Sequence, residues 1–350
     1  MQGNKPSKKK VPFDISAALQ NYLSNYNRSR TLPIQYDDMS RYISSIPLMN
    51  AKGEDTYWQT VIYEEREAKE INDACCHIYA LLKTDGDLTV IEHLSVARID
   101  FCVFGNTNPF RIRIINKIND NYDHFYIKRI DASRVYGLEL EYLLSPNILD
   151  YLIDDKTIIE EHVAGIPGDD FMKSKLEVSA FEQIRIAKEF VKFNERCFAR
   201  LLGDMRSYNY VVDITPDIEG NQYRIRAIDF DQQSYEGRKN FYLPQYFKEN
   251  NEIIDLGMGT LTVESVRQYQ LEERSLIARR ARSEMERLRE LLKCMKKDTI
   301  SDKKKIAQLC LELAAHHNSA IFKDAKSMGE LVTANIQLIL QKEFRQSIME

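Results

Sequence analysis

The sequence lacks the features that mark several large classes of protein. It has no window of about 18 uninterrupted apolar residues, so a membrane-spanning helix is not expected. Its net charge of −4 at pH 7 is small, which argues against a general nucleic-acid-binding protein. No apolar stretch follows the basic run at residues 8–10, so this start is not predicted to be a secretory signal. The six cysteines form no CxxC pair, and we expect reduced thiols in a cytoplasmic protein.

What is present suffices for a folded protein of about two structural units. Hydrophobic residues make up 43% of the 350 residues, ample for a real core. We predict a disordered basic tail over residues 1–13 and a helical extension over 14–90. A sheet-bearing lobe is expected over 91–163, and a mainly helical lobe with C-terminal helices over 164–350.

Local patterns predict the elements inside these segments. Within the extension, one helix is expected from Tyr57 to Leu82, ended by Asp85-Gly86. Three antiparallel strands in a meander follow, because alternating residues are separated by turn-rich links. The predicted strands cover residues 94–104, 110–118 and 124–130.

A helix at about 133–144 and an apolar strand at 157–163 come next, and a long helix at about 180–201 follows them. Two short strands are expected at 210–212 and 223–228, and the chain reads as helical from about residue 262. An apolar stripe there recurs at steps of three and four, which predicts an amphipathic helix packed on the rest of the fold. The stripe consists of Ile277, Ala281, Met285, Leu288, Leu292 and Met295.

The most informative pattern is a set of oxygen-bearing side chains near the middle of the chain. Asp204 is followed five residues later by Asn209, and an Ile-Asp-Phe-Asp stretch carries Asp229 and Asp231. Phosphoryl transfer from a nucleotide requires one carboxylate beside the attacking hydroxyl. It also requires an amide oxygen and a second carboxylate to hold magnesium against the triphosphate. Upstream, Lys128 is a single lysine inside an apolar strand.

Taken in order, these parts resemble the protein-kinase-like superfamily over about residues 94–240. The meander with Lys128 is followed by a helix with a glutamate, a strand, Gly165-Ile166-Pro167-Gly168, a long helix, Asp-x4-Asn and Asp-Phe. The sequence looks closest to the branch of aminoglycoside phosphotransferases and choline kinases, where Gly-Asp precedes the catalytic loop. The resemblance implies an α+β, two-lobed fold with an antiparallel-sheet N-lobe and a mainly helical C-lobe, here with the N-terminal helical extension added.

The resemblance also implies roles for the polar side chains. Asp204 would be the catalytic base or would orient the acceptor hydroxyl, and Asn209 and Asp229 would bind Mg²⁺. Asp231 would reach a second metal or cap a turn. Lys128 would hold the α- and β-phosphates of ATP. Arg129 is the alternative if the strand register is shifted by one residue.

A glutamate on the following helix would orient Lys128, and the sequence offers Glu139 and Glu141. At about 100° per residue, Glu139 falls inside a broad apolar sector, whereas Glu141 lies in the polar gap. A carboxylate buried among apolar neighbours needs a cationic partner, so Glu139 is favoured.

The nucleotide would also contact backbone groups. Gly105, Asn106 and Thr107 lie in the loop expected to cover the phosphates, and Glu161, His162 and Val163 form the expected hinge beside the adenine. Two departures from the family pattern are present. Leu202 stands where a histidine is usual, and the phosphate loop has one glycine in place of three.

The predicted activity is ATP- and Mg²⁺-dependent transfer of the γ-phosphate to a hydroxyl acceptor, either a small molecule or a protein. The Ala-Pro-Glu signature of classical protein kinases is missing after Asp229, which favours a small-molecule or atypical kinase. One alternative is a pseudokinase that binds a nucleotide or a partner without catalysis, and a second is AMP transfer on the same fold.

Overall fold

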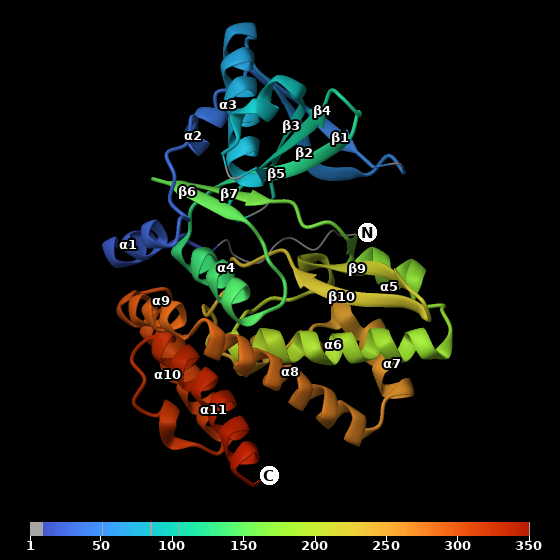
Figure 1. Cartoon of the computed structure of the whole chain (residues 1–350), viewed down its shortest axis with the longest axis vertical. Coiled ribbons are helices and arrows are strands. Elements are labelled where there is room, and N and C mark those ends of the chain that lie inside the picture. The colour runs from blue at the N-terminus through green and yellow to red at the C-terminus, as the bar shows by residue number, and fades with distance from the viewer. Residues whose placement is uncertain (1–9, 51, 85, 105, 350) are drawn as a thin grey trace. The chain divides into compact units, whose positions relative to one another are not determined.

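The computed structural model describes residues 10–50, 52–84, 86–104 and 106–349 (Figure 1). The chain divides into two compact units. Unit 1 comprises residues 1–131 and 149–162, and unit 2 comprises residues 132–148 and 163–350. The chain therefore passes from one unit to the other three times.

Unit 1 is built on a seven-stranded sheet with the order β1-β2-β3-β4-β5-β7-β6, in which every neighbouring pair is antiparallel. The predicted meander is confirmed as β3, β4 and β5, which lie side by side. The strands are β1 (Ser44–Met49), β2 (Asp55–Ile62), β3 (Leu94–Cys102), β4 (Phe110–Asn116), β5 (Tyr122–Arg129), β6 (Tyr151–Asp154) and β7 (Thr157–Glu161).

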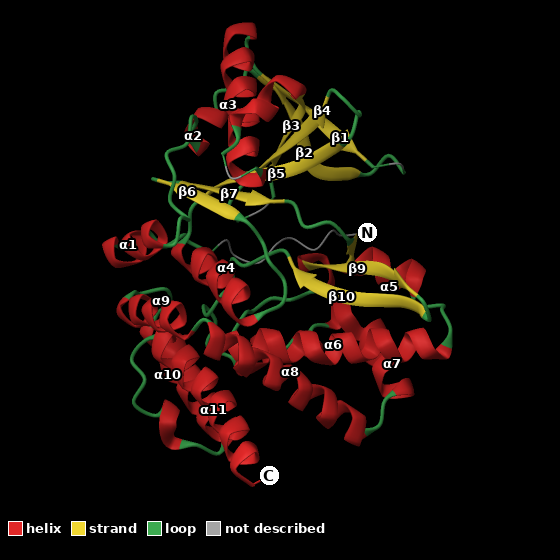
Figure 2. Cartoon of the chain, viewed as in Figure 1, coloured by secondary structure: helices red, strands yellow, loops and turns green. Residues whose placement is uncertain are grey.

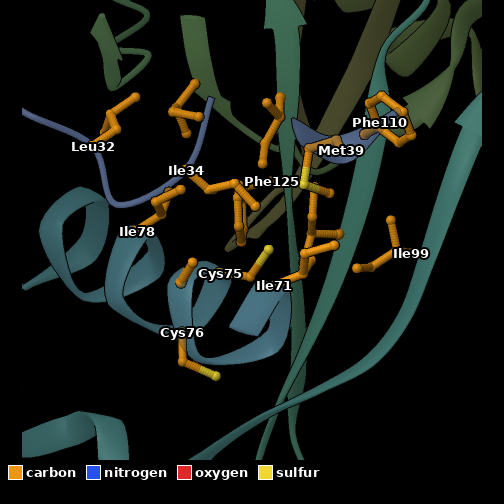
Figure 3. Packing of buried hydrophobic residues seen from close by; sticks show 14 of the residues in the cluster. Leu32, Ile34, Met39, Ile71, Cys75, Cys76, Ile78, Ile99, Phe110 and Phe125 are labelled. Carbon is orange, nitrogen blue, oxygen red and sulfur yellow. The ribbon is translucent and has the colours of Figure 1, made fainter. Parts of the chain in front are cut away.

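One helix supplies most of the cover on this sheet. α3 (Glu65–Lys83) packs against β3 and β4, and its Cys75 and Ile78 lie among strand residues such as Ile99 and Phe125 (Figure 3). Burial of each large apolar side chain contributes about 1.5–3 kcal/mol, so this cluster stabilises the packing of α3 on the sheet. The other helices of the unit are α1 (Ala17–Asn25), α2 (Tyr36–Met39) and the 3-10 helix η1 (Leu88–His93).

The predicted helix from Tyr57 to Leu82 is wrong over its first part, where the chain forms strand β2. The stretch Thr56 to Ile62 is rich in β-branched and aromatic residues, which favour a pleated, half-buried surface. β2 pairs with both β1 and β3, and this pairing prevails over the helical spacing of the apolar residues. Residues 14–90 thus contribute two strands to the sheet as well as three helices.

The segment predicted as a disordered tail, residues 1–13, is described by the structure only from residue 10 onward. Residues 1–9 lie outside the described residues. Lys10 is buried, and its Nζ is 2.7 Å from Asp131 Oδ2. The backbone N–H of Phe13 donates to the other oxygen of Asp131 at 3.0 Å. The prediction of disorder is therefore wrong for residues 10–13, because one buried carboxylate anchors them to the end of β5.

Unit 2 is mainly helical (Figure 2). A three-stranded sheet of order β10-β9-β8 lies against the long helix α6 (Ala180–Arg200). The strands are β8 (Ile166–Pro167), β9 (Tyr210–Asp217) and β10 (Gly220–Ala227). The remaining α-helices are α4 (Ala132–Leu144), α5 (Gly168–Lys175), α7 (Asn251–Thr260), α8 (Val263–Ser283), α9 (Met285–Lys297), α10 (Lys303–His317) and α11 (Met328–Met349). Among the helices of the described residues, none combines the length and the apolar character that a bilayer crossing requires.

The C-terminal apolar stripe packs inside unit 2, as predicted. The stripe extends over two helices, because the helical conformation is interrupted at Glu284, between α8 and α9. Its members are buried except for Met285, which is half-buried. α9 contacts α4 and α11, and a Cβ at Gly329 of α11 would collide with the Met295 backbone. This glycine is what allows α11 to cross α9 so closely.

Candidate active site

A strained loop follows α6 and carries Asp204. α6 ends at Arg200, and Asp204 then adopts a left-handed φ of +59°, a conformation that non-glycine residues rarely adopt. Two hydrogen bonds hold it there: Gly203 N–H donates to Gln232 O, and Asp204 N–H donates to Phe241 O at 3.2 Å. A Cβ at position 203 would meet the Phe241 ring at 2.7 Å, so the close approach requires glycine. Strained backbone of this kind is concentrated at functional sites.

Asn209 closes this loop on itself. Its Nδ2 donates to the Asp204 carbonyl at 2.7 Å, and its carbonyl accepts from Ile228 N–H at 3.0 Å. The second bond fixes the residue that precedes Asp229. The structure thus brings Asp204, Asn209 and Asp229 into one corner of unit 2 through local hydrogen bonds.

The Asp204 carboxylate is held by a neighbouring guanidinium. Arg206 Nε lies 2.8 Å from Asp204 Oδ1, and its Nη1 lies 2.8 Å from Glu249 Oε1. Burial raises the pKa of Asp204 above its ordinary value, and the Arg206 charge opposes that rise. Arg206 therefore fixes the direction of a carboxylate that is placed to accept a hydrogen bond or a proton.

The carboxylates of Asp229 and Asp231 share a partner that the sequence analysis missed. Arg134, in the first turn of α4, places Nη1 3.0 Å from Asp229 Oδ1 and 2.6 Å from Asp231 Oδ1. The side chains of Arg134 and Asp231 are 2% and 7% exposed, whereas that of Asp229 is 34% exposed. The single basic residue of α4, placed at its start, was the available signal, since a buried guanidinium requires carboxylates.

In unit 1, the carboxylate bonded to Lys128 is that of Glu160. Lys128 Nζ lies 2.7 Å from Glu160 Oε2, and both side chains are almost fully buried. On the paired strands β5 and β7, Lys128 stands opposite Ile158, and Tyr126 stands opposite Glu160. Lys128 and Glu160 are therefore diagonal neighbours on one face of the sheet, within reach of long side chains.

Both glutamates of α4 have their cations in unit 2. Glu139 is fully buried, as its apolar sector predicted, and its carboxylate accepts from Arg287 of α9 at 2.8 Å. Glu141 pairs with Arg200 of α6 and is also buried, so its predicted place in a polar gap is wrong. The predicted pairing of Glu139 with Lys128 joins residues of different units and stays a prediction. The helix face that looked polar is covered by α6.

The loop expected to cover phosphate is only partly described. Gly105 lies outside the described residues, Thr107 is buried, and Asn106 is half-buried. Asn108 pins the loop, because its Nδ2 donates to Cys102 O at 3.2 Å and its carbonyl accepts from Tyr36 Oη at 2.8 Å. The phosphate-binding role of residues 105–107 stays a prediction.

The expected hinge coincides with the point where the chain leaves unit 1. Glu161 ends β7 and is bonded to Lys83 Nζ at 2.6 Å. His162 Nδ1 lies 3.0 Å from Tyr126 Oη, and burial lowers the pKa of this imidazole. Val163 is buried in unit 2. The carboxylate and the imidazole are thus both engaged in unit 1, and contact with adenine through the backbone stays a prediction.

The oxygen donors of unit 2 suit a hard cation. In the part of the chain that the structure describes, no group of three or more His, Cys, Asp and Glu side chains is placed to bind a metal. A site made of Asn209 and Asp229 supplies two protein oxygens, and Mg²⁺ commonly takes one or two carboxylates and completes its shell with water and substrate phosphates. The residues present therefore fit a nucleotide-bound magnesium ion better than a metal held by protein alone.

Comparisons with known proteins return only solved structures of low similarity. No family model and no curated protein matches the chain. Similar solved structures include an ethanolamine kinase of Plasmodium vivax, 14% identical, covering 80% of this chain and 92% of that one, with a TM-score of 0.30. The autoinhibited serine kinase domain of titin is 14% identical, covers 70% and 92%, and has a TM-score of 0.27. The Rad53 kinase domain is 15% identical, covers 48% and 76%, and has a TM-score of 0.23.

The order of the elements defines the class. An antiparallel sheet carrying Lys128 precedes a mainly helical unit with the Asp204 loop and the Asp229 turn. The chain has an α+β fold, with a seven-stranded antiparallel sheet in unit 1 and a mainly helical unit 2, and its membership of the protein-kinase-like superfamily stays a prediction.

Proposed function

We propose that this protein is an ATP- and Mg²⁺-dependent phosphotransferase that moves the γ-phosphate of ATP to a hydroxyl group of a small molecule or a protein. The observation that carries the proposal is the closed loop of unit 2. In it, Asn209 bonds the Asp204 carbonyl and fixes the start of the Ile228-Asp229 turn. An orienting carboxylate, an amide oxygen and a second carboxylate are thereby held together, which is the set that phosphoryl transfer requires.

Each residue of this set has a distinct role in the proposal. Asp204, fixed by Arg206, orients the acceptor hydroxyl and accepts its proton. Asn209 and Asp229 would hold the magnesium ion, which when bound neutralises charge on the phosphate oxygens. The buried, strained loop keeps the carboxylate in one position, so little reorganisation is needed during transfer.

The residues of unit 1 have roles in nucleotide binding. Lys128 contacts the α- and β-phosphates, and Glu160 keeps its ammonium group in place. We assign this holding role to Glu160 because it bonds Lys128 directly, and we assign Glu139 to anchoring α9 through Arg287. Backbone groups of residues 105–107 and 161–163 complete the proposed nucleotide contacts.

A pseudokinase is the second candidate, and the ion pair between Arg134 and Asp229 favours it. A guanidinium already bonded to the carboxylate competes with a metal for the same oxygen atoms. In this case the protein binds ATP with little dependence on Mg²⁺ and transfers nothing.

Three isosteric variants separate these possibilities. In Asp229→Asn, ATP binding in the presence of Mg²⁺ is expected to be lost, because the metal loses its carboxylate. In Asp204→Asn, binding is kept while transfer of labelled γ-phosphate to metabolite or protein fractions is lost. Asp217→Asn, which changes an exposed residue of β9, is the control and should behave as wild type.

The readouts are calorimetric ATP titration with and without Mg²⁺, and transfer from γ-labelled ATP. Equal loss of ATP binding in the Asp204 and Asp229 variants would contradict the assigned roles. Wild-type protein that binds ATP with or without Mg²⁺ but labels no acceptor supports the pseudokinase. Wild-type protein that binds no ATP under either condition ends the proposal.

A further inference from the structure

Arg134 occupies an unusual place for a charged residue, because its guanidinium is buried between two carboxylates that would otherwise attract metal ions. One atom, Nη1, contacts both Asp229 Oδ1 and Asp231 Oδ1. We infer that this site takes a single divalent cation with its nucleotide, and that Arg134 supplies the second positive charge. The inference rests on the proposed nucleotide-binding function and refines it.

Asp231 is committed to Arg134 rather than to a metal. Its contact with Nη1 is 2.6 Å, and both side chains are more than nine-tenths buried. The neighbouring Ser133 Oγ donates to Gln233 O at 2.6 Å, so the start of α4 is bonded to the segment that carries Asp231. A metal bound by Asp231 would have to displace the guanidinium and leave it buried without that carboxylate, which is strongly unfavourable.

Asp229 differs from Asp231 in two respects. Its side chain is 34% exposed, so solvent and a hydrated cation can reach it. It also follows the Ile228 N–H that is bonded to Asn209, the other expected oxygen donor. The Asp229 oxygen bonded to Arg134 also accepts from Asp231 N–H at 3.0 Å, which fixes the orientation of the carboxylate. Asp229 is therefore the metal ligand in this inference, and Arg134 is a positioning residue.

The charges are consistent with this division. Arg134 places one positive charge against the carboxylates of both Asp229 and Asp231, so less negative charge remains to attract cations than at two carboxylates without a guanidinium between them. A second divalent cation would crowd three positive centres around two carboxylates. Mg²⁺ also demands near-octahedral oxygen coordination, which the buried carboxylate of Asp231, bonded to the guanidinium at 2.6 Å, is badly placed to provide.

The test counts bound ions directly. Mn²⁺ is titrated into the full-length protein saturated with a non-hydrolysable ATP analogue, and free Mn²⁺ is measured by electron paramagnetic resonance. Wild type is expected to bind one Mn²⁺ per protein, and Arg134→Gln is expected to bind two, because both carboxylates lose their bond to the guanidinium. Arg279→Gln, which removes an exposed arginine of α8, is the matched control and should bind one.

Two aspartate variants test the same inference if Arg134→Gln does not fold. Asp231→Asn should still bind one Mn²⁺, with an affinity lowered by no more than about 10–100-fold, as for a residue outside the coordination shell. Asp229→Asn should lose the bound ion. Two Mn²⁺ in wild type, or equal loss of Mn²⁺ in both aspartate variants, would overturn the inference and leave the proposed function standing. Absence of nucleotide binding to wild type, with or without Mn²⁺, would overturn both.

Discussion

The helices α3 and α4 differ in the chemical nature of their buried side chains. α3 buries one face, and every buried residue on that face is apolar or a cysteine. α4 is buried almost all round, and its buried residues include Arg134, Glu139 and Glu141. These three side chains connect α4 to the Asp229 turn, to α9 and to α6. α3 therefore covers a sheet, whereas α4 links three parts of unit 2 through ion pairs.

The difference teaches which substitutions each helix can accept. A helix held by apolar contact tolerates another apolar side chain of similar volume. A helix held by buried ion pairs tolerates shape changes poorly and charge changes least, because the remaining partner stays buried and unpaired.

The largest expected effect therefore comes from an isosteric change on α4. Glu141→Gln should lower the free energy of unfolding by about 3–5 kcal/mol, because it leaves Arg200 buried without its anion. Ile78→Leu on α3, of equal volume, should cost less than about 1.5 kcal/mol. Urea unfolding followed by circular dichroism measures both. Equal losses would remove the distinction between the two helices.

A rescue sharpens the same comparison. The double variant Glu141→Leu with Arg200→Met removes both charges at once, and it should recover most of the stability lost in Glu141→Gln. Failure to recover would show that the pair is needed for more than charge balance.

A smaller, localised effect is expected from the two glutamates considered as partners of Lys128. Glu139→Gln should raise hydrogen exchange in α4 and α9, because Arg287 loses its carboxylate. Glu160→Gln should raise exchange in β5 and β7, where Lys128 loses its carboxylate. The increase should be about tenfold or more, corresponding to a loss of about 1.4 kcal/mol in local stability.

Mass spectrometry of exchanged peptides measures both variants in the same experiment. Each variant serves as the control for the other, since the affected peptides do not overlap. Increased exchange in β5 after the Glu139 substitution would contradict the placement of that glutamate in the ion pairs of unit 2.

The smallest effect concerns pH and His124 of β5. Burial, together with the charges of His162, Arg111 and Arg113, lowers the pKa of His124 to about 4. A group whose pKa falls on folding stabilises the fold while it is neutral, so this contribution is lost as pH falls from about 6.5 towards 4. The wild-type Tm should fall by roughly 2–5 °C more than that of His124→Phe between pH 7 and pH 5.

Differential scanning fluorimetry across this range gives the comparison. His93→Phe, at a half-exposed position in η1, is the control and should keep the wild-type pH dependence. Parallel curves for wild type and His124→Phe would contradict the prediction.

Elements with a strong local pattern were predictable from the sequence. The meander strands and the helices α4 and α6 were predicted close to their observed ends, because each is specified by its own alternation or periodicity. The segment at β2 was not, since its apolar spacing fits a helix as well as a strand and the choice depends on pairing with β3.

The residues of the candidate site also differ in how far the sequence could predict them. Asp204, Asn209 and the Asp229 turn lie close in sequence, so local hydrogen bonds hold them and the motif was visible. The burial of Glu139 followed from its helical position, but its cation comes from Arg287, about 150 residues later. Glu160 could not be assigned to Lys128 without the register of β5 and β7, which no local pattern contains.

The three crossings of the chain between units bear on how the protein is made. α4 emerges from the ribosome after residues 1–131, but its partners Arg200 and Arg287 follow about 60 and 150 residues later. Translation proceeds at about 5–20 residues per second, so Arg200 and Arg287 are synthesised several seconds or more after the two glutamates. The last residue of unit 1, residue 162, is made before either arginine. During this interval the two glutamates of the nascent α4 do not yet have the arginines with which they form buried ion pairs in the folded protein. A chain stalled or cleaved between α6 and α9 is therefore the form of this protein most exposed to chaperones and proteases.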